Sequence, residues 1–190
     1  MKDTAFDLWQ VAHPAKEQRT ALRDRQHWKP PAHGWMKCNV DAAFSDGEST
    51  GATGIALRDH DGRTCGGKAI WYEHCLNAIT AEAMACRDGM QYVRDHGVRN
   101  LIVEMDCQIL VKLWEKRSLQ RSKVDPILHQ MVDLSRSFEG FSLCFISRNC
   151  NRLAHECARL VNREQPVMEW LITPQGLRAT IDDDCNLAYG

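Results

Sequence analysis

The sequence lacks the features that mark membrane proteins, secreted proteins and strongly basic nucleic-acid-binding proteins. No window approaches about 18 uninterrupted apolar residues, the length that suggests a membrane-spanning helix, and the first residues hold no apolar run of signal-peptide length. Lysine and arginine number 24 against 25 aspartates and glutamates, giving a net charge of −1. This balance disfavours a generally basic nucleic-acid binder but not a nuclease that carries its acids in a metal site. We expect an intracellular protein, nuclear or cytoplasmic.

Cysteine is abundant, but its spacing is not that of a disulfide-stabilised or zinc-binding protein. The nine cysteines are scattered along the chain, none forms a CxxC pair, and the eight histidines are equally dispersed. Several cysteines lie inside apolar segments, where a thiol behaves as a small hydrophobic group. We therefore predict reduced thiols in a reducing compartment.

The chain contains a central block of strand and helix patterns between two flanking segments. We predict that residues 1–33 form an arm, because "PAKEQRTALRDRQH" lacks a strong apolar stripe and the paired prolines of "WKPPAHGW" favour an extended spacer. Residues 34–164 predict one domain, large enough to bury a core. Residues 165–190 predict an irregular tail.

Within this domain the predicted order of elements is β-β-β-α-β-α-α-β-α. The first three strands are joined by short, turn-rich segments, including the hairpin signal Asp61-Gly62, and are therefore antiparallel neighbours. We predict an α/β fold in which helices flank a mixed five-stranded sheet, three antiparallel strands followed by two parallel ones. The strands are expected at 35–44, 52–60, 64–72, 100–106 and 141–147, and the helices at 78–96, 107–117, 125–138 and 151–164.

Three carboxylates occupy positions where a sheet–helix core favours alkyl groups. Asp41 lies near the end of the first strand, Glu82 lies beside the apolar stripe of the first helix, and Asp106 ends the strand "LIVEMD". Each has a structural alternative: a turn cap, a side chain that reaches water, and a helix N-cap. Clustered carboxylates repel one another and need a cation. Hard oxygen ligands suit Mg²⁺ or Mn²⁺, and two such ions about 4 Å apart can support phosphodiester hydrolysis.

Five segments, taken in order, resemble the ribonuclease H domain. They are "KCNVDAAF", "GIALRDHDG", "AEAMA", "VEMDCQILV" and "SRNCNRLAHECARL". The likeness covers about residues 28–164 and is to the plant branch found in non-LTR retrotransposon polyproteins, associated with reverse transcriptase, and as stand-alone proteins. It implies an endonuclease with two Mg²⁺ or Mn²⁺ ions that hydrolyses the RNA strand of RNA–DNA hybrids. We also expect the protein to be a monomer.

The resemblance also assigns roles to individual residues. Asp41, Glu82 and Asp106 would be catalytic metal ligands, with Glu82 near the ribose 2′-hydroxyl that distinguishes RNA from DNA. Many ribonucleases H place a fourth carboxylate in the last helix, where this chain has His155. His155 points away from the core stripe, so it is not expected to be a core histidine; we predict a site residue, the alternative being an exposed surface histidine. Imidazole is softer than carboxylate and would favour Mn²⁺ over Mg²⁺, or it could position water or transfer a proton.

The expected hybrid-binding surface departs from the family pattern. The loop before the last helix is too short for the mobile histidine of some members, and the asparagine ahead of Glu82 is shifted. A basic run at 112–123 surrounds Trp114 and suits phosphate contact, the alternative being a solvated helix face with Trp114 in the core. Two other functions stay open: a catalytically weak nucleic-acid-binding or interaction module, and a related exonuclease or transposase. The predicted nucleic-acid contacts are Asn77, Lys112, Lys116, Arg117, Arg121, Arg148 and Arg152.

Overall fold

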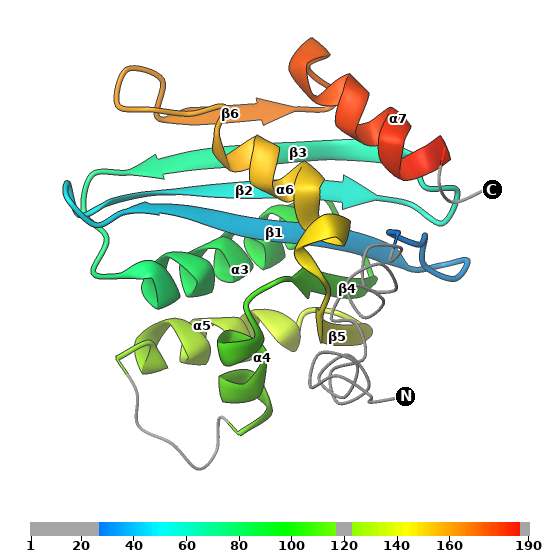
Figure 1. Cartoon of the computed structure of the whole chain (residues 1–190). Coiled ribbons are helices and arrows are strands. Elements are labelled where there is room, and N and C mark those ends of the chain that lie inside the picture. Colours follow the sequence, from blue (N-terminus) through cyan, green and yellow to red (C-terminus); the bar gives the residue numbers. More distant parts are fainter. Residues whose placement is uncertain (1–26, 117–122, 187–190) are drawn as a thin grey trace, which may run out of the picture.

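The centre of the molecule is a six-stranded mixed sheet. The computed structural model describes residues 27–116 and 123–186, with side chains up to residue 183 (Figure 1). The strand order is β5-β4-β1-β2-β3-β6, in which β1, β2 and β3 are antiparallel while β4 runs parallel to both β1 and β5. The predicted mixed sheet is confirmed, with one strand more than expected. The first five strands are β1 (Met36–Ser45), β2 (Thr50–Arg58), β3 (Thr64–Tyr72), β4 (Asn100–Met105) and β5 (Gly140–Phe145).

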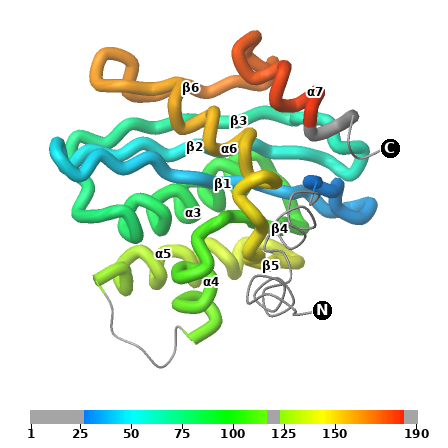
Figure 2. Tube along the Cα trace, in the orientation of Figure 1, coloured from blue at the N-terminus to red at the C-terminus, as the bar shows by residue number. Residues whose placement is uncertain are grey.

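Helices cover both faces of this sheet. The long helix α3 (Ala78–Asp95) packs against β1 and β2 on one face, and α6 (Arg152–Ala158) crosses the same strands on the opposite face (Figure 2). The helices α4 (Gln108–Glu115) and α5 (Asp125–Ser135) lie on the side of α3. Gly54 permits close contact with α6, because a Cβ there would overlap the backbone of Ala154 and Ala158.

The segment after α6 is ordered, which corrects the prediction of an irregular tail. β6 (Val167–Trp170) adds to the edge of β3, and η2 (Gln175–Leu177) leads into α7 (Arg178–Asn186). Trp170 and Leu177 are buried in a second core cluster with residues of α6. The tail folds because these two apolar side chains, separated by a turn, are buried in the same cluster as Leu153 and Cys157 of α6.

The last predicted helix is shorter than expected. A 3-10 turn, η1 (Arg148–Asn151), leads into α6, which ends at Ala158 rather than at residue 164. Past this end, the Asn162 side-chain oxygen accepts hydrogen bonds from the backbone N–H groups of Glu164 and Gln165, both at 2.9 Å. This side chain competes with helical hydrogen bonding and turns the chain toward β6.

The segment ahead of β1 lies against the sheet rather than extending away from it. Trp28 is only 3% exposed. The Lys37 ammonium donates to the backbone carbonyl of Lys29 at 2.8 Å, and the Asn100 side chain donates to that of Gly34 at 3.1 Å. Residues 27–34, predicted as a spacer, are therefore anchored to β1 and β4.

Two predicted absences can be compared with the structure. The eight cysteines whose side chains it describes are all free thiols. Among residues 27–116 and 123–186, no helix combines the length and apolar character that crossing a bilayer requires.

Candidate active site

The three predicted carboxylates meet at one edge of the sheet. Asn39 of β1 pairs with Glu104 of β4, so Asp41 and Asp106 lie two residues further along neighbouring parallel strands. Glu82 lies in the second turn of α3, which packs against β1. One oxygen from each of Asp41, Glu82 and Asp106 lies within 4.8 Å of the others. The structure thus brings together residues that are up to 65 positions apart in the sequence.

Burial makes this cluster electrostatically unfavourable without a cation. Asp41 is 5% exposed, and burial together with the neighbouring Asp106 carboxylate raises the pKa of Asp41 to about 6. Burial, Asp41 and Asp106 raise the pKa of Glu82 to about 8, and Arg148 opposes this rise. Within the described part of the chain, the buried Oε2 atom of Glu82 meets no hydrogen-bond donor. An unpartnered carboxylate oxygen beside two aspartates fits a hard divalent cation such as Mg²⁺ or Mn²⁺.

His155 faces the cluster from α6. Its Nδ1 atom lies 2.8 Å from Oδ2 of Asp41, and its side chain is one-third exposed. The contact lowers the pKa of Asp41 and partly offsets the effect of burial. The structure therefore places His155 beside a carboxylate of the cluster, and its catalytic role stays a prediction.

Asn151 is a site residue that the sequence reasoning missed. It is fully buried at the end of η1, and its amide nitrogen donates to the backbone carbonyl of Val40 at 2.9 Å and to Oδ1 of Asp106 at 3.2 Å. These bonds connect α6 to the strands that carry both aspartates. The one available signal was an asparagine at the first position of a predicted helix, which also suits an ordinary cap.

The predicted nucleic-acid contacts are distributed over several elements. Lys112, Lys116, Arg148 and Arg152 are exposed, and Arg148 is close enough to Glu82 to lower the pKa of that carboxyl. Asn77, which is half-buried, caps α3, because its side-chain oxygen accepts from the backbone N–H of Thr80 at 2.9 Å.

The remaining predicted contacts are Arg152 and the arginines of the basic run at 112–123, which also contains Trp114. Arg152 lies 3.5 Å from Asp183 of α7. Trp114 belongs to the core and packs edge-to-face on Phe141, which confirms the structural alternative for this residue. Arg117 and Arg121 lie outside the described residues.

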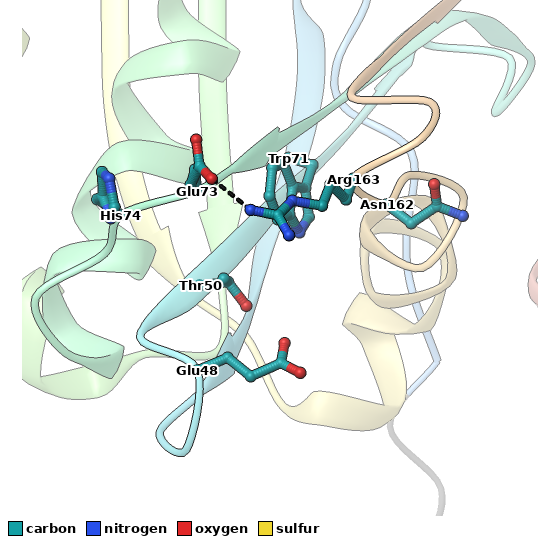
Figure 3. Close-up of a pocket in the computed structure, with 7 residues that line it drawn as sticks. All are labelled: Glu48, Thr50, Trp71, Glu73, His74, Asn162 and Arg163. Carbon is teal, nitrogen blue, oxygen red and sulfur yellow. Dashed lines mark hydrogen bonds and ion pairs between the residues drawn. The ribbon is translucent and has the colours of Figure 1, made fainter.

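A groove of about 650 Å³ lies beyond the carboxylate cluster, between the start of β2, the end of β3 and the segment after α6 (Figure 3). Trp71 and Arg163 line it, and Arg163 pairs with Glu73 at 2.5 Å. Glu48 adds a second acid to the same lining. Because its charges are mixed, this groove has no evident preference for phosphates. We therefore base the chemistry on the carboxylate cluster.

Comparisons with known proteins identify the family and the fold of the chain. The model of the reverse transcriptase-like family matches residues 39–161, and no curated protein matches the sequence. The N-terminal ribonuclease H domain of a Mycobacterium tuberculosis protein is similar with a TM-score of 0.61 at 15% identity, over 66% of this chain and 91% of that one.

Two ribonucleases H1 give comparable values. The enzyme of the archaeon Halobacterium salinarum has a TM-score of 0.61 at 18% identity, over 66% of this chain and 95% of that one. The ribonuclease H1 LC11, solved in complex with an RNA/DNA hybrid, has a TM-score of 0.60 at 13% identity, over the same shares. At such identities the likeness establishes a common fold.

Proposed function

The chain belongs to the reverse transcriptase-like family and has the ribonuclease H fold, and from this premise we propose that it is a metal-dependent endonuclease acting on the RNA strand of RNA–DNA hybrids. The observation that carries the proposal is the cluster of Asp41, Glu82 and Asp106 at one sheet edge, with a buried Glu82 oxygen that meets no donor in the described chain. A module that only binds nucleic acid has no need of three converging acids.

In this proposal each side chain of the cluster has a distinct task. Asp41 and Asp106 would hold two Mg²⁺ or Mn²⁺ ions, and the unpartnered Glu82 oxygen would bind one of them. When bound, such ions polarise a phosphodiester and lower the pKa of a coordinated water. Asn151 keeps Asp106 oriented, and His155 restrains Asp41 in the region where many relatives have a carboxylate.

The exposed cations would bind the backbone of the hybrid. Arg148, the cation whose charge lowers the pKa of Glu82, would hold a phosphate next to the scissile bond. Lys112 of α4 and Lys116, which directly follows this helix, would contact the hybrid farther from the cluster. Because Lys and Arg contacts to phosphates release counterions, we expect hybrid binding to weaken as the salt concentration rises.

The test is cleavage of a hybrid that carries labels on both strands, in the presence of Mg²⁺ or Mn²⁺. The proposal predicts nicks in the RNA strand alone, no cleavage in EDTA, and a loss of at least about 100-fold for Asp106→Asn. Asp133→Asn is a matched control, because Asp133 is an exposed aspartate of α5 that pairs with Arg136. A folded protein that binds the hybrid and cleaves neither strand with either ion would contradict the proposal and favour a binding module. Cleavage of the DNA strand would favour a related exonuclease or transposase.

A further inference from the structure

A chain of buried polar side chains connects the segment before β1 to the carboxylate cluster. We call it the Glu104 network, and each member is at most 4% exposed. Polar groups buried to this degree are costly unless they bond to one another. The matched family region begins at residue 39, so the network reaches outside it. Its members are Trp28, Asn39, Arg58, Glu104 and Asn151.

Glu104 lies at the centre of this network. Its Oε2 atom accepts hydrogen bonds from the indole N–H of Trp28 at 2.8 Å and from the side-chain amide of Asn39 at 3.0 Å. Its Oε1 atom lies 2.5 Å from the Lys37 ammonium. The Trp28 ring also covers the Arg58 guanidinium, with 3.4 Å between that group and the ring centroid. Trp28 therefore contacts both buried charges and excludes water from them.

The charges on either side determine the orientation of the Asn39 side chain. Glu104 can only accept hydrogen bonds and Arg58 can only donate them. Accordingly, the Asn39 nitrogen donates to Glu104, while its oxygen accepts from Arg58 at 2.8 Å. If the Asn39 amide were reversed, its NH₂ group would face the guanidinium and its oxygen would face the carboxylate. One orientation is therefore strongly preferred.

The fixed orientation of Asn39 in turn restricts the orientation of the Asn151 amide beside Asp106. Its nitrogen lies 3.4 Å from the side-chain oxygen of Asn151, so the Asn151 amide presents its oxygen to Asn39 and its nitrogen to Oδ1 of Asp106. A reversed Asn151 would direct an oxygen at the Asp106 carboxylate, which repels it. The Glu104 carboxylate and the Arg58 guanidinium together orient Asn39, and Asn39 and the backbone carbonyl of Val40, which accepts from the Asn151 nitrogen at 2.9 Å, together orient Asn151.

We propose that Trp28 is a positioning residue for the metal centre, acting through Glu104, Asn39 and Asn151 on Asp106. The inference rests on the proposed function, because it takes Asp106 as a metal ligand. It makes the segment before β1 a part of the catalytic unit. Groups that orient metal ligands from outside typically change metal affinity about 10-fold to 100-fold when they are lost. Trp28 is several bonds from Asp106, so we expect the lower end of this range.

The test compares Trp28→Phe with Trp170→Phe in the full chain. Phenylalanine preserves an aromatic ring at position 28 but cannot donate to Glu104. Trp170 is a buried tryptophan in the second core cluster, and its indole N–H meets no acceptor in the described part of the chain. Its replacement therefore changes packing without removing a bond of the Glu104 network. Mn²⁺ binding to metal-free protein is measured by titration calorimetry, and thermal unfolding is followed by circular dichroism.

We expect Trp28→Phe to weaken Mn²⁺ binding about 10-fold, and Trp170→Phe to change it less than about twofold. Glu104→Gln is a second variant, because its amide can present an N–H to Asn39 and disturb the same orientation. Wild-type affinity in both folded network variants would overturn the inference. Loss of folded structure in both would also overturn it, because the network would then stabilise the fold rather than position Asp106. If the wild type itself binds no Mn²⁺, the proposed metal site fails instead.

Discussion

Replacing Glu82 by glutamine is expected to stabilise the metal-free protein, although it removes a proposed ligand. Burial and the Asp41 and Asp106 carboxylates raise the pKa of Glu82 from the usual 4.5 to about 8. A carboxyl with a raised native pKa contributes full stability below the unfolded pKa, and that contribution is lost as the pH rises toward the native pKa. Metal-free protein should therefore lose stability between about pH 4.5 and pH 8.

The size of the effect follows from the same values. At pH 7 the unfolded chain ionises this carboxyl freely, whereas the folded protein holds it protonated. At about 1.36 kcal/mol for each pKa unit between 4.5 and pH 7, this costs the folded state on the order of 3 kcal/mol. Glutamine is neutral and of similar shape, but its amide also needs partners. We expect a net gain of about 1 to 3 kcal/mol, or about 2 to 10 °C in Tm.

Urea unfolding in EDTA, at pH 5 and at pH 8, measures this prediction. The wild type should be less stable at pH 8, and the difference between the two pH values should be smaller in Glu82→Gln. Mn²⁺ should restore the wild type at pH 8 and have less effect on the variant. Glu115→Gln, at an exposed position on α4, controls for the loss of one negative charge. A Glu82→Gln variant that is less stable than the wild type at pH 8 in EDTA would refute the reasoning.

Three further predictions concern His155, Arg148 and Trp170. His155→Asp places a hard ligand beside Asp41, so the ratio of the cleavage rate in Mg²⁺ to that in Mn²⁺ should rise. An unchanged ratio would exclude contact between His155 and an ion. Arg148→Ala should remove one phosphate contact, so the plot of log affinity against log salt concentration should become less steep by about 0.9. Fluorescence anisotropy with a labelled hybrid measures this slope, and an unchanged slope would show that Arg148 does not contact the hybrid. Trp170→Ala should lower the free energy of unfolding in urea by about 3 kcal/mol, because this side chain packs against residues of α6. A loss below about 0.5 kcal/mol would show that β6 is not needed for the fold.

The sequence predicted the elements and the three acids because these depend on local pattern. Strands and helices follow from alternation and helical spacing, and Asp41, Glu82 and Asp106 were noticeable as charges at apolar positions. The structure explains why the two aspartates converge: β1 and β4 are parallel neighbours, so Asp41 and Asp106 lie at the same edge of the sheet. The structure brings these carboxylates together as expected.

The Glu104 network could not be predicted in the same way. Glu104 was equally anomalous in "LIVEMD", but its partners Trp28 and Asn39 are 76 and 65 residues away, and no periodicity links them. Asn151 contacts Asp106 only because α6 packs on the sheet. The strand β6 was missed because it is only four residues long and shows too little alternation. The end of α6 was missed because a single side chain, Asn162, turns the chain after it.

The most direct test of the metal centre is anomalous diffraction from crystals soaked in Mn²⁺. The account predicts anomalous peaks between the carboxylates of Asp41, Glu82 and Asp106, and their loss or weakening in Asp106→Asn crystals. Saturating Mn²⁺ that gives no peak among these three side chains, or peaks only elsewhere on the protein, would contradict it.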